Sequence, residues 1–262
     1  MRRHGAEHRS LHRDDLTRFR KRDVLESPFL RLMGLSLEVG ILADLKDSDE
    51  EGVEYHREAF ERLNTFLASR GLPRHSEPLD CEVWSADMAG YSTLHDVRRI
   101  AAYLDCDRQL PAASTGQSSK DPCLEGYWAA VEGKESGFVG RLFRPRPKYR
   151  REFDHLIIHS DAEGYYLPID FPDVLFPPAH LEIAGGMVGS VPRLLQEIER
   201  LARRLEIPVG VETDTDELSD LLRAPLAEGP LWQRYGRESF GCVTLREGCR
   251  HAMATGAALV FA

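Results

Sequence analysis

The chain has 262 residues, enough for one large domain or two small ones, and its composition excludes an intrinsically disordered protein. Apolar residues make up 42 % of the sequence and charged residues 29 %, which is the balance of a globular protein with a substantial core. The formal net charge of −9 repels phosphate backbones and attracts basic surfaces. We therefore expect a protein partner more basic than the chain itself, and we expect nucleic acid to be an unfavourable ligand.

Membrane and secretory signals are missing from the sequence pattern. No apolar run reaches the ~18–20 residues that a membrane-spanning helix needs, and no apolar stretch follows the basic N-terminal residues. The cysteine count of five is odd, with no CxxC pair, which is typical of reduced and mostly buried thiols. These patterns predict a cytoplasmic protein with no membrane partner, no metal and no cofactor.

The N-terminal part of the chain is predicted to combine a strand with a long helix. Residues 1–13 are expected to be a flexible basic arm, and residues 14–262 a single globular domain. Apolar residues alternate within 35–45, which favours a strand. Residues 50–71 place apolar side chains on one helical face, and Gly71 provides a natural C-terminal stop.

The middle of the chain is predicted to contain short elements and one connector. Residues 82–84 suit a short strand, residues 92–106 an amphipathic helix, and residues 122–131 a shorter helix. Residues 133–152 are polar, basic and rich in proline, which makes this connector the best candidate for an internal boundary.

A β-hairpin is predicted at residues 155–170. HLIIH is interpreted as the first strand, SDAEG as the turn and YYLPID as the returning strand. A helix over 191–205 follows, with Ser190 as its N-cap, and the chain ends in a strand near 257–261. The uneven order of helices and strands predicts an α+β fold, in which a small mixed or antiparallel sheet packs against several helices.

Polar and aromatic residues gather around the predicted turn of this hairpin. Turns on rigid strands often carry function, so we interpret the group as a polar pocket or a partner-contacting edge. The alternative is that they are ordinary turn and strand residues whose side chains bond their own backbone. The residues are His159, Asp161, Glu163, Tyr165, Tyr166, Asp170 and Asp173.

A second candidate binding group lies between the predicted strand at 82–84 and the helix that follows it. Tyr91 and His95 are four residues apart, so a helix that includes both would present them on one face beside Trp84. Such a group suits the lining of a cleft, and it equally suits a helix N-terminus with a half-buried aromatic residue.

Two long segments resemble a family of bacterial proteins for which no activity is established. They are HLIIHSDAEGYYLPIDFPDVLF and GGMVGSVPRLL, and the resemblance extends to EVWSADMAGYSTLHDVRRIAAYLDC and to ATGAALVF at the end of the chain. The resemblance implies a bacterial, cytoplasmic, globular unit and assigns no catalytic residue, cofactor or partner.

No GxSxG, HExxH, Walker or CxxC motif identifies an enzyme. The leading hypothesis is therefore a non-enzymatic binding protein that presents an acidic surface to a basic partner, as an immunity protein does to a toxin. One alternative is a hydrolase or transferase, metal-assisted or not, with a pocket of His, Asp and Glu residues at 159–173. The other is a nucleic-acid-associated protein that uses the Arg-rich arm and the connector.

Overall fold

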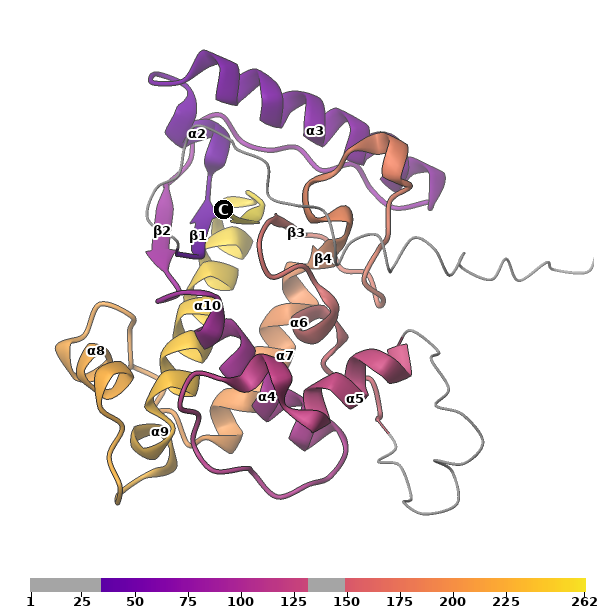
Figure 1. Cartoon of the computed structure of the whole chain (residues 1–262). Helices are drawn as coiled ribbons and strands as arrows, with labels where there is room; N and C mark the ends of the chain where they lie inside the picture. The colour runs from indigo at the N-terminus through magenta and orange to yellow at the C-terminus, as the bar shows by residue number, and fades with distance from the viewer. Residues whose placement is uncertain (1–33, 132–148) are drawn as a thin grey trace, which may run out of the picture. The chain divides into compact units, whose positions relative to one another are not determined.

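The computed structural model describes residues 34–131 and 149–262, which lie in the compact unit Met33–Ala262 (Figure 1). The predicted arm at 1–13 and most of the predicted connector at 133–152 lie outside the described residues. The described residues form an α+β fold with one mixed sheet, as the sequence predicts.

The sheet has five strands in the order β2-β1-β5-β3-β4. The pair β3 and β4 is parallel, while the other neighbouring pairs are antiparallel. The last strand of the chain therefore lies in the centre of the sheet, between the first strand and the third. The strands are β1 (Ser36–Val39), β2 (Trp84–Asp87), β3 (Gly164–Leu167), β4 (Val188–Ser190) and β5 (Leu259–Phe261).

Neighbouring residues in the central strands belong to two different hydrophobic cores. Tyr166 and Phe261 belong to the larger core, whereas Tyr165 and Val260 belong to the smaller one. Because side chains alternate along a strand, the two cores lie on opposite faces of the sheet. Both faces are thus covered, and the central strands are buried throughout.

The smaller core is covered by α3 (Glu50–Ser69), which Figure 1 shows along one side of the sheet. The larger core is formed by α4 (Tyr91–Asp105), α7 (Val191–Arg204) and α10 (Gly236–Thr255). The remaining helices are α2 (Ile41–Leu45), α5 (Pro122–Val131), α6 (Asp154–Ile158), α8 (Asp216–Arg223) and α9 (Leu231–Arg234), with short 3-10 turns at Ser118–Lys120, Ala179–Leu181 and Ala184–Gly186.

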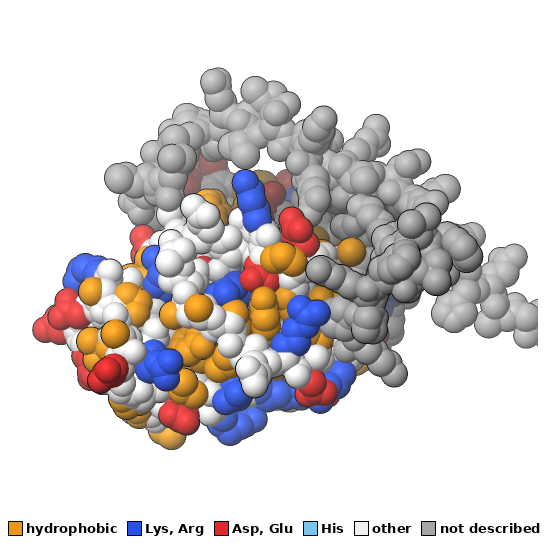
Figure 2. All heavy atoms as spheres, turned by 60° about the horizontal axis from the view of Figure 1, so that its bottom comes forward, with side chains coloured by type: hydrophobic (Ala, Val, Ile, Leu, Met, Phe, Trp, Pro, Cys, Tyr) orange, Lys and Arg blue, Asp and Glu red, His pale blue; other side chains and the backbone are white. Residues whose placement is uncertain are grey.

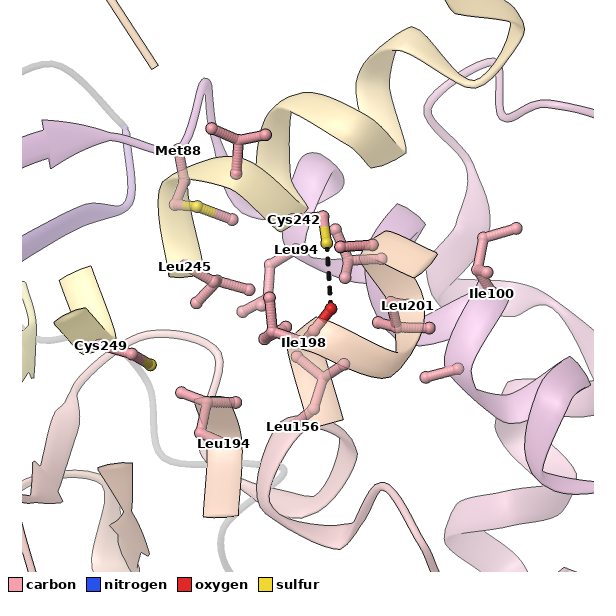
Figure 3. Packing of buried hydrophobic residues seen from close by; sticks show 14 of the residues in the cluster. Met88, Leu94, Ile100, Leu156, Leu194, Ile198, Leu201, Cys242, Leu245 and Cys249 are labelled. Carbon is pink, nitrogen blue, oxygen red and sulfur yellow. Dashed lines mark hydrogen bonds between the residues drawn. The ribbon is translucent and has the colours of Figure 1, made fainter. Parts of the chain in front are cut away.

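Helix α10 is the centre of the larger core, and small residues allow its neighbours to approach closely. The Cys242 thiol donates a hydrogen bond to the carbonyl of Ile198 in α7, at 3.5 Å between sulfur and oxygen (Figure 3). A Cβ atom at Gly241 would lie only 2.7 Å from a methyl carbon of Val97 in α4. The backbones of α10 and α4 therefore pack at a distance that a larger residue at 241 would not permit.

The predicted hairpin at 155–170 is wrong in its first half. Residues 154–158 form α6, and only residues 164–167 form a strand, which pairs with β4 and β5. The buried carboxylate of Glu197 accepts hydrogen bonds from the backbone amides of His155 (3.1 Å) and Leu156 (2.8 Å), which supplies partners for the first turn of α6. This contact across 41 residues is invisible in a short apolar run, which suits a helix as well as a strand.

Candidate functional site

His159 and Tyr166, two of the predicted site residues, are buried structural residues. Their rings stack with centroids 3.9 Å apart, and the Tyr166 hydroxyl donates to the carbonyl of His155 at 2.8 Å. The ring nitrogens of His159 each lie 3.2 Å from a backbone carbonyl oxygen. Burial lowers the pKa of His159 to about 3, so its imidazole is neutral at physiological pH.

Tyr165 lies on the other face of the sheet, under α3. Its hydroxyl lies 3.0 Å from Nδ1 of His56, and its ring packs 5.1 Å from that of Phe60. Burial raises the pKa of Tyr165, so it is a neutral phenol. Because Tyr165 and Tyr166 face opposite cores, the structure does not bring them into one pocket.

His95 and Asp161, which were predicted in two separate groups, are joined by a direct side-chain contact. Nε2 of His95 lies 3.1 Å from a carboxylate oxygen of Asp161, and this hydrogen bond lowers the pKa of Asp161 to about 2. The His95 ring also meets the edge of Trp128, and its Nδ1 is buried without a hydrogen-bond partner among the described residues.

The other predicted acids are dispersed. Glu163 and Asp173 are exposed, and Asp170 forms an ion pair with Arg193 at 2.5 Å. The part of the chain that the structure describes holds no group of three or more His, Cys, Asp or Glu side chains placed to bind a metal ion. Whether any of these residues contacts a ligand stays a prediction.

Trp84 and Tyr91 lie on different elements. The Trp84 indole stacks on His251 of α10, with ring centroids 5.4 Å apart, while Tyr91 begins α4 and is 40 % exposed. Trp84 also lines a cavity of about 640 Å³, together with Asp87, Glu212, Asp214 and Glu247 and the basic side chains of Arg250 and His251.

The site residues predicted from the sequence do not include a row of exposed glutamates along α3. At ~100° per residue these glutamates fall within an arc of about 100°, opposite the side on which Phe60, Leu63 and Leu67 enter the core. Glu51, Glu54, Glu58 and Glu61 recur every three or four residues, and this helical spacing is visible in the sequence. The prediction of this helix used only its apolar residues. We call this row the α3 acidic row; it consists of the exposed residues Glu50, Glu51, Glu54, Glu58 and Glu61.

Helix stability explains only part of the α3 acidic row. Asp49 caps the helix by accepting a hydrogen bond from the Gly52 amide at 2.9 Å, and Glu50 and Glu51 lie in the first turn, where the helix dipole favours negative charge. Glu54, Glu58 and Glu61 lie beyond that turn, where the dipole gives no such advantage.

Three arginines lie near the row, and one of them, Arg57, is exposed on the same side of α3 as Glu50 and Glu61. A guanidinium nitrogen of Arg62 lies 3.4 Å from a carboxylate oxygen of Glu58, and one of Arg74 lies 2.9 Å from a carboxylate oxygen of Glu61. The other three carboxylates of the α3 acidic row make no ion pair with any described residue. Surface pairs of this kind contribute little to stability. With five exposed carboxylates beside three arginines, the row keeps a net negative charge.

The spacing of the α3 acidic row is close to the charge spacing of one DNA strand. Glu50 and Glu61 are eleven residues apart, which corresponds to about 16 Å along a helix. One strand of B-DNA carries a phosphate every ~3.4 Å of axis, so about five phosphates occupy the same length. Five carboxylates on α3 thus match about five phosphates in linear charge density.

Negative charge is concentrated in the described residues. Of the 34 Lys and Arg residues, nine lie in 1–33 and five in 132–148, whereas these segments hold five and two of the 43 Asp and Glu residues. The described residues therefore carry 20 basic and 36 acidic side chains, a formal charge of −16. The face turned forward in Figure 2, which is lowest in Figure 1, mixes blue, red and orange side chains and carries no such row.

Residues 33–261 match the model of a protein family described as "Putative DNA-mimic protein". The chain belongs to this family. A search of curated proteins and a search of solved structures gave no match. The match is consistent with the predicted membership of a family without an established activity. The bacterial origin and the motifs on which that resemblance was based stay predictions.

The family corrects two predictions from the sequence. The immunity-type binding protein, with a basic partner of unspecified kind, is wrong, because a DNA-mimic family points to proteins that bind DNA. Of the two alternatives, nucleic-acid association was closer than a hydrolase or transferase, although the family points to the DNA-binding protein and not to the nucleic acid. Net charge alone could not distinguish a general basic partner from a DNA-binding one.

No helix among the described residues combines the length and the apolar character that crossing a bilayer requires.

Proposed function

We propose that this protein imitates one strand of DNA and occupies the phosphate-binding surface of a DNA-binding protein. The observation that carries the proposal is the α3 acidic row, with about five carboxylates over the length of about five phosphates. Membership of the DNA-mimic family and the charge of the described residues support the same role.

The row is held on a rigid element, which favours binding. Phe60, Leu63 and Leu67 anchor the opposite side of α3 in the smaller core, with exposed fractions of 5 % or less. The backbone positions of the glutamates are therefore set before a partner arrives, and little ordering of the helix opposes association. Arg and Lys side chains that grip phosphates would meet carboxylates at comparable intervals.

Tyr55 extends this surface with an aromatic group. It lies four residues after Glu51 and three before Glu58, and 52 % of it is exposed. An Arg guanidinium that pairs with either glutamate could also stack on the Tyr55 ring. The combination of carboxylate and aromatic face suits an Arg-rich DNA-binding surface.

We assign the role to α3 and not to the acidic cavity beside Trp84. In that cavity Glu247 accepts hydrogen bonds from the backbone amide (2.8 Å) and hydroxyl (2.6 Å) of Thr213. Both of its carboxylate oxygens therefore already have partners within the protein. Arg250 and His251 line the same space. All five glutamates of the α3 acidic row are exposed, whereas Glu247 is only partly exposed.

Displacement from immobilised DNA tests the proposal. Extract from cells that encode the chain is loaded on immobilised duplex DNA, and the purified full chain is used as eluant in place of salt. The expected result is release of specific DNA-binding proteins, identified by mass spectrometry. A variant with Glu54→Gln, Glu58→Gln and Glu61→Gln should release them at least ~10-fold less efficiently, which corresponds to ~1.4 kcal/mol.

The matched control changes three other exposed glutamates and removes the same total charge. Glu125, Glu206 and Glu228 make no side-chain hydrogen bond or ion pair with described residues, so their Gln variant should behave as the unmodified chain. Equal loss in both variants would mean that only net charge acts, and no loss in either would mean that α3 is not the binding surface.

We also propose that the protein acts in the cytoplasm. All five cysteines are free thiols, which fits a reducing compartment that also holds DNA-binding proteins.

A further inference from the structure

Two cysteines from different helices have their sulfur atoms side by side. Cys106 caps the C-terminus of α4, Cys123 is the second residue of α5, and their Sγ atoms are 3.5 Å apart. A disulfide has a sulfur–sulfur distance of about 2.05 Å, so the atoms need to approach by only ~1.5 Å, which small side-chain rotations can supply.

No other two of the five cysteines, all of which are described, have sulfurs in contact. Cys242 and Cys249 are fully buried in α10, and the Cys242 thiol bonds to the carbonyl of Ile198. Cys81 is partly exposed but has no sulfur neighbour. Contact between two sulfurs is therefore confined to Cys106 and Cys123.

We propose that Cys106 and Cys123 form a reversible disulfide when the protein meets an oxidising small-molecule disulfide such as oxidised glutathione. The Cys106 thiolate attacks one glutathione sulfur, forms a mixed disulfide and releases one glutathione thiolate. The Cys123 thiolate then attacks Sγ of Cys106, forms the Cys106–Cys123 bond and releases the second glutathione thiolate. The protein loses two electrons and two protons, and one glutathione disulfide becomes two glutathione thiols.

Accessibility sets this order of attack. Cys106 is partly exposed, whereas Cys123 is buried and its carbonyl accepts a hydrogen bond from the Tyr149 hydroxyl at 2.8 Å. The pKa of Cys123 is raised to about 12, mainly by burial and to a smaller extent by the hydrogen bond with Cys106. Cys106 therefore reacts first, and closure by Cys123 is the slow step.

The disulfide would close the loop between α4 and α5 at its base. This loop carries Ser114 and Ser118, whose hydroxyls donate to the buried carboxylate of Asp96. Cross-linking the two ends of the loop restricts its opening, so oxidation should slow proteolysis and amide hydrogen exchange between residues 107 and 121.

Thiol counting on the full chain tests the proposal. The protein is incubated with glutathione mixtures of increasing oxidised fraction, alkylated, digested and analysed by mass spectrometry. The expected result is a fall from five free thiols to three, with a linked peptide pair containing Cys106 and Cys123, and full recovery after dithiothreitol. Cys106→Ser should abolish the loss, while Cys81→Ser, a matched partly exposed control, should leave the link intact.

Three results would overturn the proposal. They are five free thiols throughout, a linked peptide pair that involves another cysteine, and a glutathione adduct on Cys106 that never proceeds to the internal link. The linkage map comes from the unmodified chain, so the outcome does not depend on whether a variant folds. The proposed disulfide does not involve α3, so its test does not depend on the proposed DNA-mimic role.

Discussion

Glu61 follows Phe60 directly in α3, and the turn of about 100° between them places Phe60 in the core and Glu61 in solvent. The Phe60 ring packs 5.1 Å from that of Tyr165 in the smaller core, while the Glu61 carboxylate is exposed and meets Arg74 at 2.9 Å. The same helix thus holds the sheet with one face and presents the α3 acidic row with the other.

Truncation of the buried side should cost far more stability than truncation of the exposed side. Phe60→Ala removes a buried aromatic ring, and we expect the free energy of unfolding to fall by about 3–5 kcal/mol. Glu61→Ala should change it by no more than about 0.5 kcal/mol. Urea denaturation of both variants measures the difference, and similar values would mean that α3 does not pack on the sheet as described.

Gly241→Ala should destabilise the protein, although alanine favours helices. The added methyl group would lie 2.7 Å from Cγ2 of Val97 and 3.0 Å from Cγ2 of Thr93, so α4 and α10 would have to separate. We expect a net loss of about 1–2 kcal/mol after the helix-propensity gain of up to ~1 kcal/mol. Thermal unfolding measures it, and a rise in Tm would contradict the close packing.

Glu238 should make stability fall as the pH rises. Burial raises the pKa of Glu238 from its ordinary 4.5 to about 7, so the folded state binds more protons than the unfolded state between these values. Its stabilising contribution is fully present below about pH 4.5 and is lost as the pH approaches 7.

Glu238→Gln tests this because it keeps an oxygen that can accept the hydrogen bond from the Ser114 amide, at 2.8 Å in the unmodified protein. The unfolding free energy of the unmodified protein should drop relative to the variant between pH 5 and pH 8. Parallel curves for the two proteins over this range would show that the carboxyl of Glu238 titrates normally.

His159 has the opposite sign. Its pKa is lowered from 6.5 to about 3, so the unfolded state binds more protons between these values, and stability falls as the pH drops below 6.5. NMR of the histidine rings should show the His159 signals unchanged from pH 8 to pH 5. A titration midpoint near 6.5 would mean that the ring is exposed to solvent.

The sequence predicted the parts of the fold that depend on local pattern. The helix at 191–205, with Ser190 as its cap, corresponds to α7. The strand predicted within 35–45 is confirmed at β1 but is wrong over 41–45, which form α2. It could not predict α6, because the amides of His155 and Leu156 find their acceptor in Glu197, far along the chain. Neither the spacing of apolar residues nor the turn residues near 155–158 indicates such a long-range contact.

The α3 acidic row could have been predicted from the sequence, whereas the burial of the predicted hairpin residues could not. The glutamates of α3 recur at helical spacing, and that spacing can be read directly from residues 50–61. In contrast, burial of His159 between Tyr166 and Phe261 depends on β5, and Phe261 lies 102 residues after His159. Residue type marked His159 as reactive, but packing makes it a neutral core residue.

Competition for one partner tests the central claim most directly. A DNA-binding protein recovered by displacement is bound to fluorescent duplex DNA, and the anisotropy is followed as the chain is added at several salt concentrations. We predict complete release of the duplex at each salt concentration, and at least ~10-fold weaker competition by the Glu54→Gln, Glu58→Gln, Glu61→Gln variant. A ternary complex in which the duplex stays bound, or equal competition by that variant, would contradict the account.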